Sequence, residues 1–319
     1  MSIAAATDTA SPSRANSRSV VVGSSSVRGA AWGVVAVTIW GVYLAFARAN
    51  VSVGIAPADL AFIRFAVAGP IMLPWMLRHP PNGITGFGWR RAVILAILAG
   101  PLFILIGASG FHFAPLSHGA VVQPAAVTVA TLGLSALLLG HSLTRRRLVG
   151  AGVILVGLVL VAGPSALHGG ITSVLGDALF ATAGLLWALF AVMSQRWSVS
   201  PIAATAAVSV VSAAIYIPLY LLIHGRPDFA GLPIGLLIQL VVVHGVLSGV
   251  VAVFAFGRAV QLLGAPRAAA FPALVPVVAA LAGIPIAHEF PATWQVAGLL
   301  IVTLGLLVTQ IPTTLKRNS

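Results

Sequence analysis

The sequence predicts an all-α membrane protein with ten transmembrane helices, arranged as two inverted five-helix repeats, with the N- and C-termini in the cytoplasm. Three observations support this prediction: the composition, the distribution of basic residues and an internal similarity at a nearly constant offset. Of the 319 residues, 59% are hydrophobic and only 7% are charged, and the mean hydropathy is +1.07. Because a soluble protein has roughly 25% charged residues, the composition excludes a soluble globular fold.

Ten segments have the roughly 20 mostly apolar residues that a membrane-spanning helix needs. They are residues 29–47, 58–77, 92–111, 118–139, 148–163, 174–194, 202–223, 234–256, 266–287 and 292–312. Residues 1–28 contain eight Ser and three Arg and lack apolar periodicity, so we expect a disordered cytoplasmic tail there. An organellar transit peptide has a similar composition and is the alternative for this stretch. A second short cytoplasmic tail is expected at 313–319, and the two repeats then cover 29–163 and 171–312.

The basic residues lie almost entirely on one side of the predicted membrane. If the N-terminus is inside, the inner segments hold 14 Lys and Arg and the outer loops hold two, which favours both termini in the cytoplasm. The net charge of +12 does not indicate nucleic-acid binding, because the basic residues stand singly or in short clusters between apolar runs. Arg is used far more than Lys, and Ala and Gly are abundant, so we expect a multi-pass protein of a bacterial inner (plasma) membrane.

The two halves of the chain resemble one another. A shift of 148 positions brings Pro124-Ala125-Ala126-Val127 onto Pro272-Ala273-Leu274-Val275, Gly150 onto Gly298 and Gly157 onto Gly305, and a shift of 147 brings Trp40 onto Trp187. Each half holds five predicted spans. Since five is odd, the halves have opposite orientations in the membrane, and such an inverted repeat is typical of secondary transporters with alternating access.

The chain resembles the ten-helix EamA-type exporters of the drug/metabolite transporter superfamily over roughly residues 29–312. The residues that carry the resemblance are Trp40-Gly41, Arg64-Phe65, Leu139-Gly140-His141-Ser142-Leu143, Gly150, Gly157, Trp187-Ala188, Pro276, Glu289 and Gly298. The chain departs from the family pattern at Thr128, His141 and His288, which replace a Pro, a Glu and a Gly. The resemblance implies an exporter, and it implies a structural role for Glu289, which would cap the turn before the last helix.

Polar and aromatic side chains inside the predicted spans are the candidates for a substrate cavity, because polar groups are costly there. The candidates are Trp40, Tyr43, Arg64, Gln123, Pro124, Trp187, His244, Phe271 and Pro272. The tryptophans each stand three residues before a second aromatic residue, a pattern that suits an aromatic cage or ordinary helix packing. A proline inside a helix frees a backbone carbonyl, so the two Pro sites either line the cavity or only kink their helices.

Arg64 and His244 each have two interpretations. The Arg64 guanidinium either extends to the outer headgroups or faces the cavity and binds a substrate carboxylate, for which Arg offers a bidentate fork. His244 either is neutral and bonded to a neighbouring helix, or relays protons during transport.

The sequence predicts a gradient-driven transporter that exports small metabolites such as amino acids, or amphipathic drugs, by alternating access around a central cavity. No Gly-rich nucleotide loop, zinc-protease motif or paired carboxylates are present in the sequence, so we expect no enzyme activity, no cofactor and no metal. An integral membrane enzyme and a non-transporting membrane scaffold are the alternatives. The expected partners are a small-molecule substrate and the lipid bilayer. Gly29-xxx-Gly33 and Gly245-xxx-Gly249 favour either tight helix packing or a homodimer.

Overall fold

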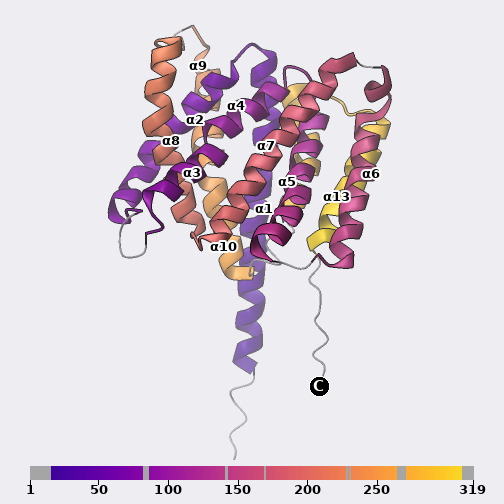
Figure 1. The fold of residues 1–319 in the computed structure, drawn as a ribbon, viewed down its shortest axis with the longest axis horizontal. Helices are drawn as coiled ribbons and strands as arrows, with labels where there is room; N and C mark the ends of the chain where they lie inside the picture. The colour runs from indigo at the N-terminus through magenta and orange to yellow at the C-terminus, as the bar shows by residue number, and fades with distance from the viewer. Residues whose placement is uncertain are drawn as a thin grey trace, which may run out of the picture.

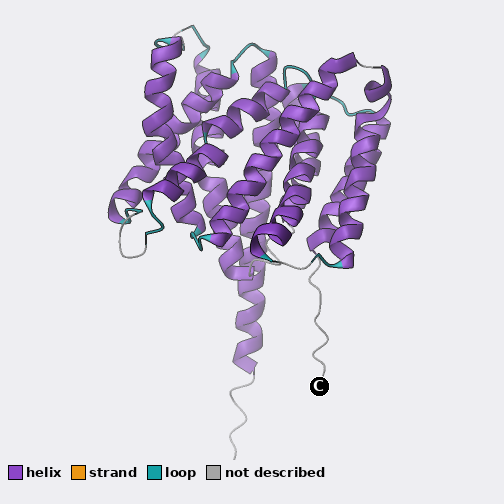
Figure 2. Ribbon diagram, in the orientation of Figure 1, coloured by secondary structure: helices purple, strands orange, loops and turns teal. Residues whose placement is uncertain are grey.

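The structure is a computed structural model that describes residues 16–81, 86–140, 143–168, 170–227, 229, 231–263 and 271–310. Over these residues the chain is helical, with loops between the helices and no strand (Figure 2). The helices stand side by side in one bundle (Figure 1). The start of the first helix and the end of the last lie at the same end of this bundle (Figure 1). His141 and residues 313–319, which belong to the sequence predictions, lie outside the described residues.

Each of the ten predicted spans overlaps at least one helix. In chain order they are α1 (Asn16–Ser52), α2 (Pro57–Arg78), α3 (Trp89–Ala99), α4 (Pro101–Gly110), α5 (Leu116–Leu139), α6 (Arg145–His168), α7 (Gly170–Arg196), α8 (Pro201–His224), α9 (Ile234–Gln239), the π-helix η1 (Leu240–Val251), α10 (Ala252–Leu263), the 3-10 helix η2 (Phe271–Leu274), α12 (Val275–Ala287) and α13 (Thr293–Gln310). Among the described residues, seven helical stretches are long and apolar enough to cross a membrane, and two shorter apolar ones cover Phe271–Ala287 and Thr293–Thr309. The chain is therefore a multi-pass helical membrane protein.

Two of these elements differ from the sequence prediction. Helix α1 begins at Asn16 rather than at residue 29, so its first turns include residues that were expected in the disordered tail. The predicted span 92–111 is two helices, because Gly100 leaves the helical conformation and Pro101 has no N–H to continue the backbone ladder. The helix ends otherwise follow local chemistry. Pro begins α2, α4 and α8, and Ser200 caps α8 by accepting from the N–H of Ala203 at 3.3 Å.

The two halves pack against each other with reciprocal contacts. Helices α6 and α13, the last of each half, lie together (Figure 1). A Cβ placed on Gly157 would meet the carbonyl oxygen of Gly298 at 2.9 Å, and one on Gly150 would meet that of Gly305 at 2.9 Å. The shift of 148 positions relates Gly150 to Gly298 and Gly157 to Gly305, so each of these two contacts is the symmetry equivalent of the other. The helices are therefore antiparallel and packed at glycines, as an internal two-fold axis between inverted repeats requires.

The same exchange relates the other helix pairs. Helix α1 packs against α10 and α12, and its counterpart α7 packs against α4 and α5. Helix α2 packs against η1, and its counterpart α8 packs against α3. Counterparts α2 and α8 also pack directly on each other. There a Cβ on Gly69 would lie 2.5 Å from that of Ala213. Helices therefore pack mainly on partners from the opposite half.

The two helix irregularities occupy equivalent places in the halves. A Cβ on Gly100, at the break between α3 and α4, would lie 2.4 Å from the Ser212 hydroxyl of α8. A Cβ on Gly249, inside the π-helix η1, would lie 3.1 Å from the Cβ of Ala68 in α2. A shift of 144 positions relates α2 to α8, because it brings Pro57 onto Pro201, and it also brings Ala68 onto Ser212. Both third spans are thus irregular where they pass the second helix of the other half.

The glycine motifs that raised the possibility of a dimer contact are used inside the chain. Gly29 packs against Leu263, and Gly33 against the ring of Phe271. Gly245 packs against Val67, and its partner Gly249 packs against α2. Small residues allow this close approach of helices within one bundle.

Candidate functional site

Five polar side chains from three helices meet where α1, α2 and η1 pack together. They are Tyr43 and Asn50 of α1, Arg64 of α2, and His244 and Ser248 of η1, and we name them the internal polar cluster. Asn50, His244 and Ser248 are at most 3% exposed. The first two helices belong to the first half and η1 to the second, so the cluster lies across the interface between the halves.

Arg64 is held by the π-helix. Its Nη1 donates to the Ser248 hydroxyl at 2.6 Å, and its Nη2 lies 3.5 Å from the Ser248 carbonyl oxygen. The Ser248 hydroxyl in turn donates to the carbonyl of His244 at 3.1 Å, one turn earlier. The half-buried guanidinium is therefore hydrogen-bonded between two helices, and this arrangement differs from the interpretation in which it extends to the outer headgroups.

His244 is bonded through its ring to α1. The Asn50 amide nitrogen lies 3.0 Å from His244 Nε2. In this orientation the amide nitrogen donates and Nε2 accepts, which corresponds to the neutral imidazole with its proton on Nδ1. The π-helix places this ring at the interface, and π-helical turns often occur at functional sites. The ring thus has a partner on a neighbouring helix, as one of its two interpretations predicted, and this partner is a side-chain amide.

Tyr43 completes the cluster on the α1 side. Its ring contacts the His244 ring edge-on with centroids 5.1 Å apart. The Arg64 guanidinium carbon lies 5.6 Å from the centroid of the same Tyr43 ring, within the range of a cation–π interaction. One phenol ring therefore contacts both the cation and the neutral imidazole.

The other predicted aromatic residues lie outside the cluster. Trp40, one turn before Tyr43, contacts Phe256 of α10 with ring centroids 5.5 Å apart. Trp187 contacts Phe103 of α4 at 5.1 Å and Phe190 at 5.2 Å. Each tryptophan thus packs on a phenylalanine from the third span of the opposite half, so the structure has two separate aromatic contacts instead of one shared cage.

The two proline sites also lie elsewhere and differ from each other. Pro124 is inside α5, and its carbonyl accepts from Thr128 at 3.0 Å. Gln123 lies beside Gly107 of α4, where a Cβ would be 3.6 Å from its Oε1. Pro272 is in the 3-10 turn η2 directly before α12, and Phe271 packs on α1. Equivalent sequence positions therefore have different local backbones.

Sequence reasoning missed two members of the cluster, Asn50 and Ser248. Asn50 lies beyond the predicted end of the first span at residue 47, whereas α1 continues to Ser52. Asn50 follows Arg48 by two positions, and this second polar residue was a signal that the first helix extends beyond residue 47. Ser248 gave no signal, because a hydroxyl in an apolar helix commonly bonds only its own backbone.

A second polar group joins the ends of several helices at the predicted outer surface. Arg48 Nε lies 2.5 Å from Glu289 Oε1, and Arg48 Nη1 donates to the carbonyl of Phe111 at 2.5 Å. Glu289 Oε2 accepts from the N–H of Leu116 at 2.7 Å. The carboxylate thus ties α1 and α5 to the end of α12. The resemblance implied a cap on the turn before the last helix. The N–H of Glu289 donates to the carbonyl of Gly283 at 3.3 Å at the end of α12, and the side chain in addition makes contacts across the bundle.

The remaining described acids also have partners. Asp59 accepts a hydrogen bond from the hydroxyl of Tyr220. Asp177 pairs with His118 Nδ1 at 2.9 Å, between α7 and α5. Within the described residues, no group of three or more His, Cys, Asp or Glu is arranged to hold a metal ion.

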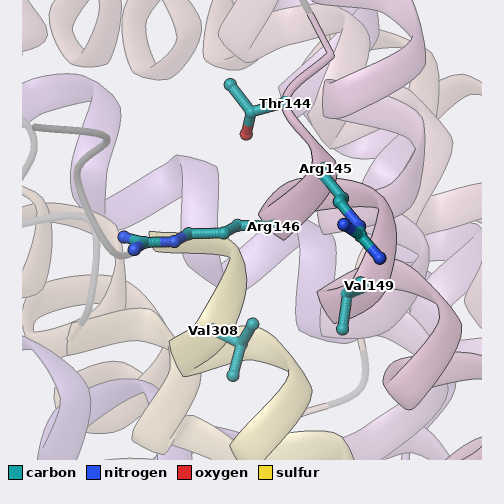
Figure 3. Close-up of a pocket in the computed structure, with 5 residues that line it drawn as sticks. All are labelled: Thr144, Arg145, Arg146, Val149 and Val308. Carbon is teal, nitrogen blue, oxygen red and sulfur yellow. The ribbon is translucent and has the colours of Figure 1, made fainter. Parts of the chain in front are cut away.

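A surface hollow of about 430 Å³ lies between the start of α6 and the end of α13 (Figure 3). It is lined by Thr144, Arg145, Arg146, Val149 and Val308. Its arginines belong to the segment that the charge distribution assigns to the inner surface. None of the predicted site residues lines this hollow, so it is separate from the internal polar cluster.

The duplicated helical bundle, with irregular third spans and a polar cluster between its halves, has an architecture that is typical of membrane transporters. The sequence matches the EamA-like transporter family twice, over residues 27–163 and 174–311. The chain therefore belongs to the EamA-like transporter family, and each half is one copy of the family's repeat. This confirms both the resemblance and the internal duplication predicted from the sequence.

Comparison with solved structures supports the fold and gives no information on function. A solved crystal structure is similar over 90% of this chain and 96% of its own length, with a TM-score of 0.58 and 20% identity. At this identity the likeness concerns the backbone arrangement. A comparison with curated proteins gave no match.

Proposed function

We propose that the protein is a gradient-driven secondary transporter that exports small metabolites such as amino acids, or amphipathic drugs, across the bacterial inner membrane. Membership of the EamA-like transporter family supports transport. The proposal includes ten membrane spans, cytoplasmic termini and opposite orientations of the halves. Within this proposal the chain is not an enzyme, and its partners are a small-molecule substrate and the bilayer.

The observation that carries the proposal is the position of the internal polar cluster. Arg64 lies on the first half and its hydrogen-bond partner Ser248 on the second. Alternating access moves two structural repeats relative to one another around a fixed site. Polar groups that bond across this interface are therefore placed to bind a solute and to sense the movement of the halves.

Helix irregularity supports the same interpretation. The break at Gly100 and the π-helix η1 stand at equivalent points of the two halves. Interrupted helices near the repeat interface commonly line transporter sites. We place the substrate beside η1 rather than beside Gly100, because the described polar side chains gather at η1.

An export screen tests this function. Cells that overproduce the chain are challenged with toxic amino-acid analogues and amphipathic drugs, and their tolerance and intracellular content are compared with cells that carry the empty vector. We expect tolerance to at least one compound together with a lower intracellular content of it. Unchanged content of every compound, or conversion of a compound without its export, would favour a scaffold or an enzyme instead.

A further inference from the structure

The charge of Arg64 is the starting point, because it has no negatively charged partner among the described residues. Its contacts are the Ser248 hydroxyl and carbonyl and the Tyr43 phenol ring. The Tyr43 phenol and the His244 imidazole are the other titratable groups of the cluster, and both are taken in their neutral forms. All of these partners are uncharged, so the cluster as a whole carries a net positive charge.

The acids elsewhere in the described bundle are already engaged. Glu289 is paired with Arg48, Asp177 is paired with His118, and Asp59 accepts from Tyr220. None of these contacts involves Arg64.

An unpaired charge between apolar helices is costly. Withdrawing an ion from water has a penalty of several kcal/mol, which only a good counter-ion or many hydrogen bonds offset. Two hydrogen bonds to one serine leave the guanidinium, which has five N–H donors, with unused capacity. Among the residues that the structure describes, the guanidinium therefore lacks a counter-ion, which a bound anion would supply.

Deepening the proposed function, and resting on it, we propose that the transported substrate carries a carboxylate that binds the Arg64 guanidinium between α1, α2 and η1. Ser248 holds one part of the guanidinium and orients the rest toward the substrate. A single cation matches a single negative charge, and a planar guanidinium matches a planar carboxylate bidentately. The positive cluster repels cationic amphipathic drugs. The substrate class is thus small carboxylic acids, including zwitterionic amino acids.

The rival role for Arg64 is a clamp that only joins α2 to η1. Both roles use the bond to Ser248, so loss of that bond does not separate them. A preference of the unmodified protein for acids over their amides, which lack the carboxylate, does separate them, because a clamp has no reason to discriminate between the two.

The test uses the purified full chain in proteoliposomes and matched pairs of labelled compounds: leucine and leucinamide, phenylalanine and phenylalaninamide, and succinate and succinamide, with tetraphenylphosphonium as a cationic probe. We expect flux of at least one acid to exceed that of its amide about tenfold or more, as a lost charge-assisted hydrogen bond predicts. Arg64→Lys should reduce this acid flux about tenfold or more. Arg258→Lys, at an exposed arginine of α10, is the matched control and should leave it unchanged.

Equal flux of acids and amides, flux of the cation alone, or full acid flux in Arg64→Lys overturns the carboxylate proposal and leaves the transporter function standing. Absence of flux for all of these compounds overturns the carboxylate proposal, and the transporter function is overturned only if the compounds from the export screen also show no flux. If Arg64→Lys does not accumulate in the membrane, the acid-to-amide ratio of the unmodified protein still decides between the two roles.

Discussion

Gly157 and Gly298 face each other across the α6–α13 contact, each with its backbone against the other. A Cβ on Gly298 would lie 2.8 Å from the carbonyl of Gly157, and a Cβ on Gly157 would lie 2.9 Å from the carbonyl of Gly298. This contact and its counterpart between Gly150 and Gly305 are exchanged by the shift that relates the repeats. These two equivalent glycine contacts determine how closely α6 and α13 approach each other at this edge of the bundle.

A side chain at this contact should destabilise the fold. We expect Gly157→Ala to cost about 1–3 kcal/mol, because both helices must move apart to fit the methyl group. The apparent unfolding temperature of the detergent-solubilised protein measures the loss. Gly152→Ala in the same helix is the control, since nothing lies within 4 Å of a Cβ there. Equal unfolding temperatures for the two variants would show that the helices are not packed at Gly157.

The inverted repeat also predicts on which side of the membrane the C-terminus and the α8–α9 loop lie. A reporter fused after Ser319 should be active in the cytoplasm, and one inserted in the loop between α8 and α9 should be active outside. The positive-inside distribution of Lys and Arg is the physical reason. An external C-terminus would contradict the orientation inferred from the basic residues, and two reporters active on the same side would be incompatible with five spans in the second half.

The Arg48–Glu289 pair should contribute to stability through the connections it makes. Each side chain of the pair is about a quarter exposed, so solvent screens part of the interaction and we expect Glu289→Gln to cost only about 1 kcal/mol. A double-mutant cycle with Arg48→Met, read by unfolding temperature, should show that the two changes are not additive. Additive effects would mean that the carboxylate acts mainly through the N–H of Leu116.

Substitution of His244 distinguishes a neutral hydrogen-bond acceptor from a proton relay. Asn50 donates to the His244 ring, and a glutamine oxygen can replace that acceptor. We therefore expect His244→Gln to retain abundance and flux, whereas His244→Leu leaves a buried donor unpaired at a cost of about 1–3 kcal/mol. A proton relay makes a different prediction: His244→Gln would fold normally yet lose the dependence of flux on a proton gradient.

Much of the fold was predictable because membrane helices are determined by composition and length. The helical segments follow the apolar runs, and the repeat followed from glycine, proline and tryptophan at a nearly constant offset. The π-helix η1 was not predictable, because its sequence Leu240–Val251 is an ordinary apolar run. Gly100-Pro101 was a signal that the third span is divided, but a single span over 92–111 was predicted.

The candidate site was predictable only in part. Tyr43, Arg64 and His244 were each conspicuous as polar groups inside apolar spans, and the structure brings these three together. That they meet depends on α2 packing against η1, a tertiary contact with no signature in either helix alone. For the same reason Gln123, Trp187 and Phe271 were grouped with them although their helices face other neighbours.

Flux through a sealed membrane distinguishes a transporter from a membrane scaffold or a membrane enzyme. Proteoliposomes that contain the full chain are loaded with a labelled compound identified by the export screen, and its release is followed with and without an imposed ion gradient. We expect saturable release that depends on the protein and that changes when an ionophore dissipates the gradient. Release no faster than from protein-free vesicles, for every compound that the cells tolerate, would contradict transport by this chain.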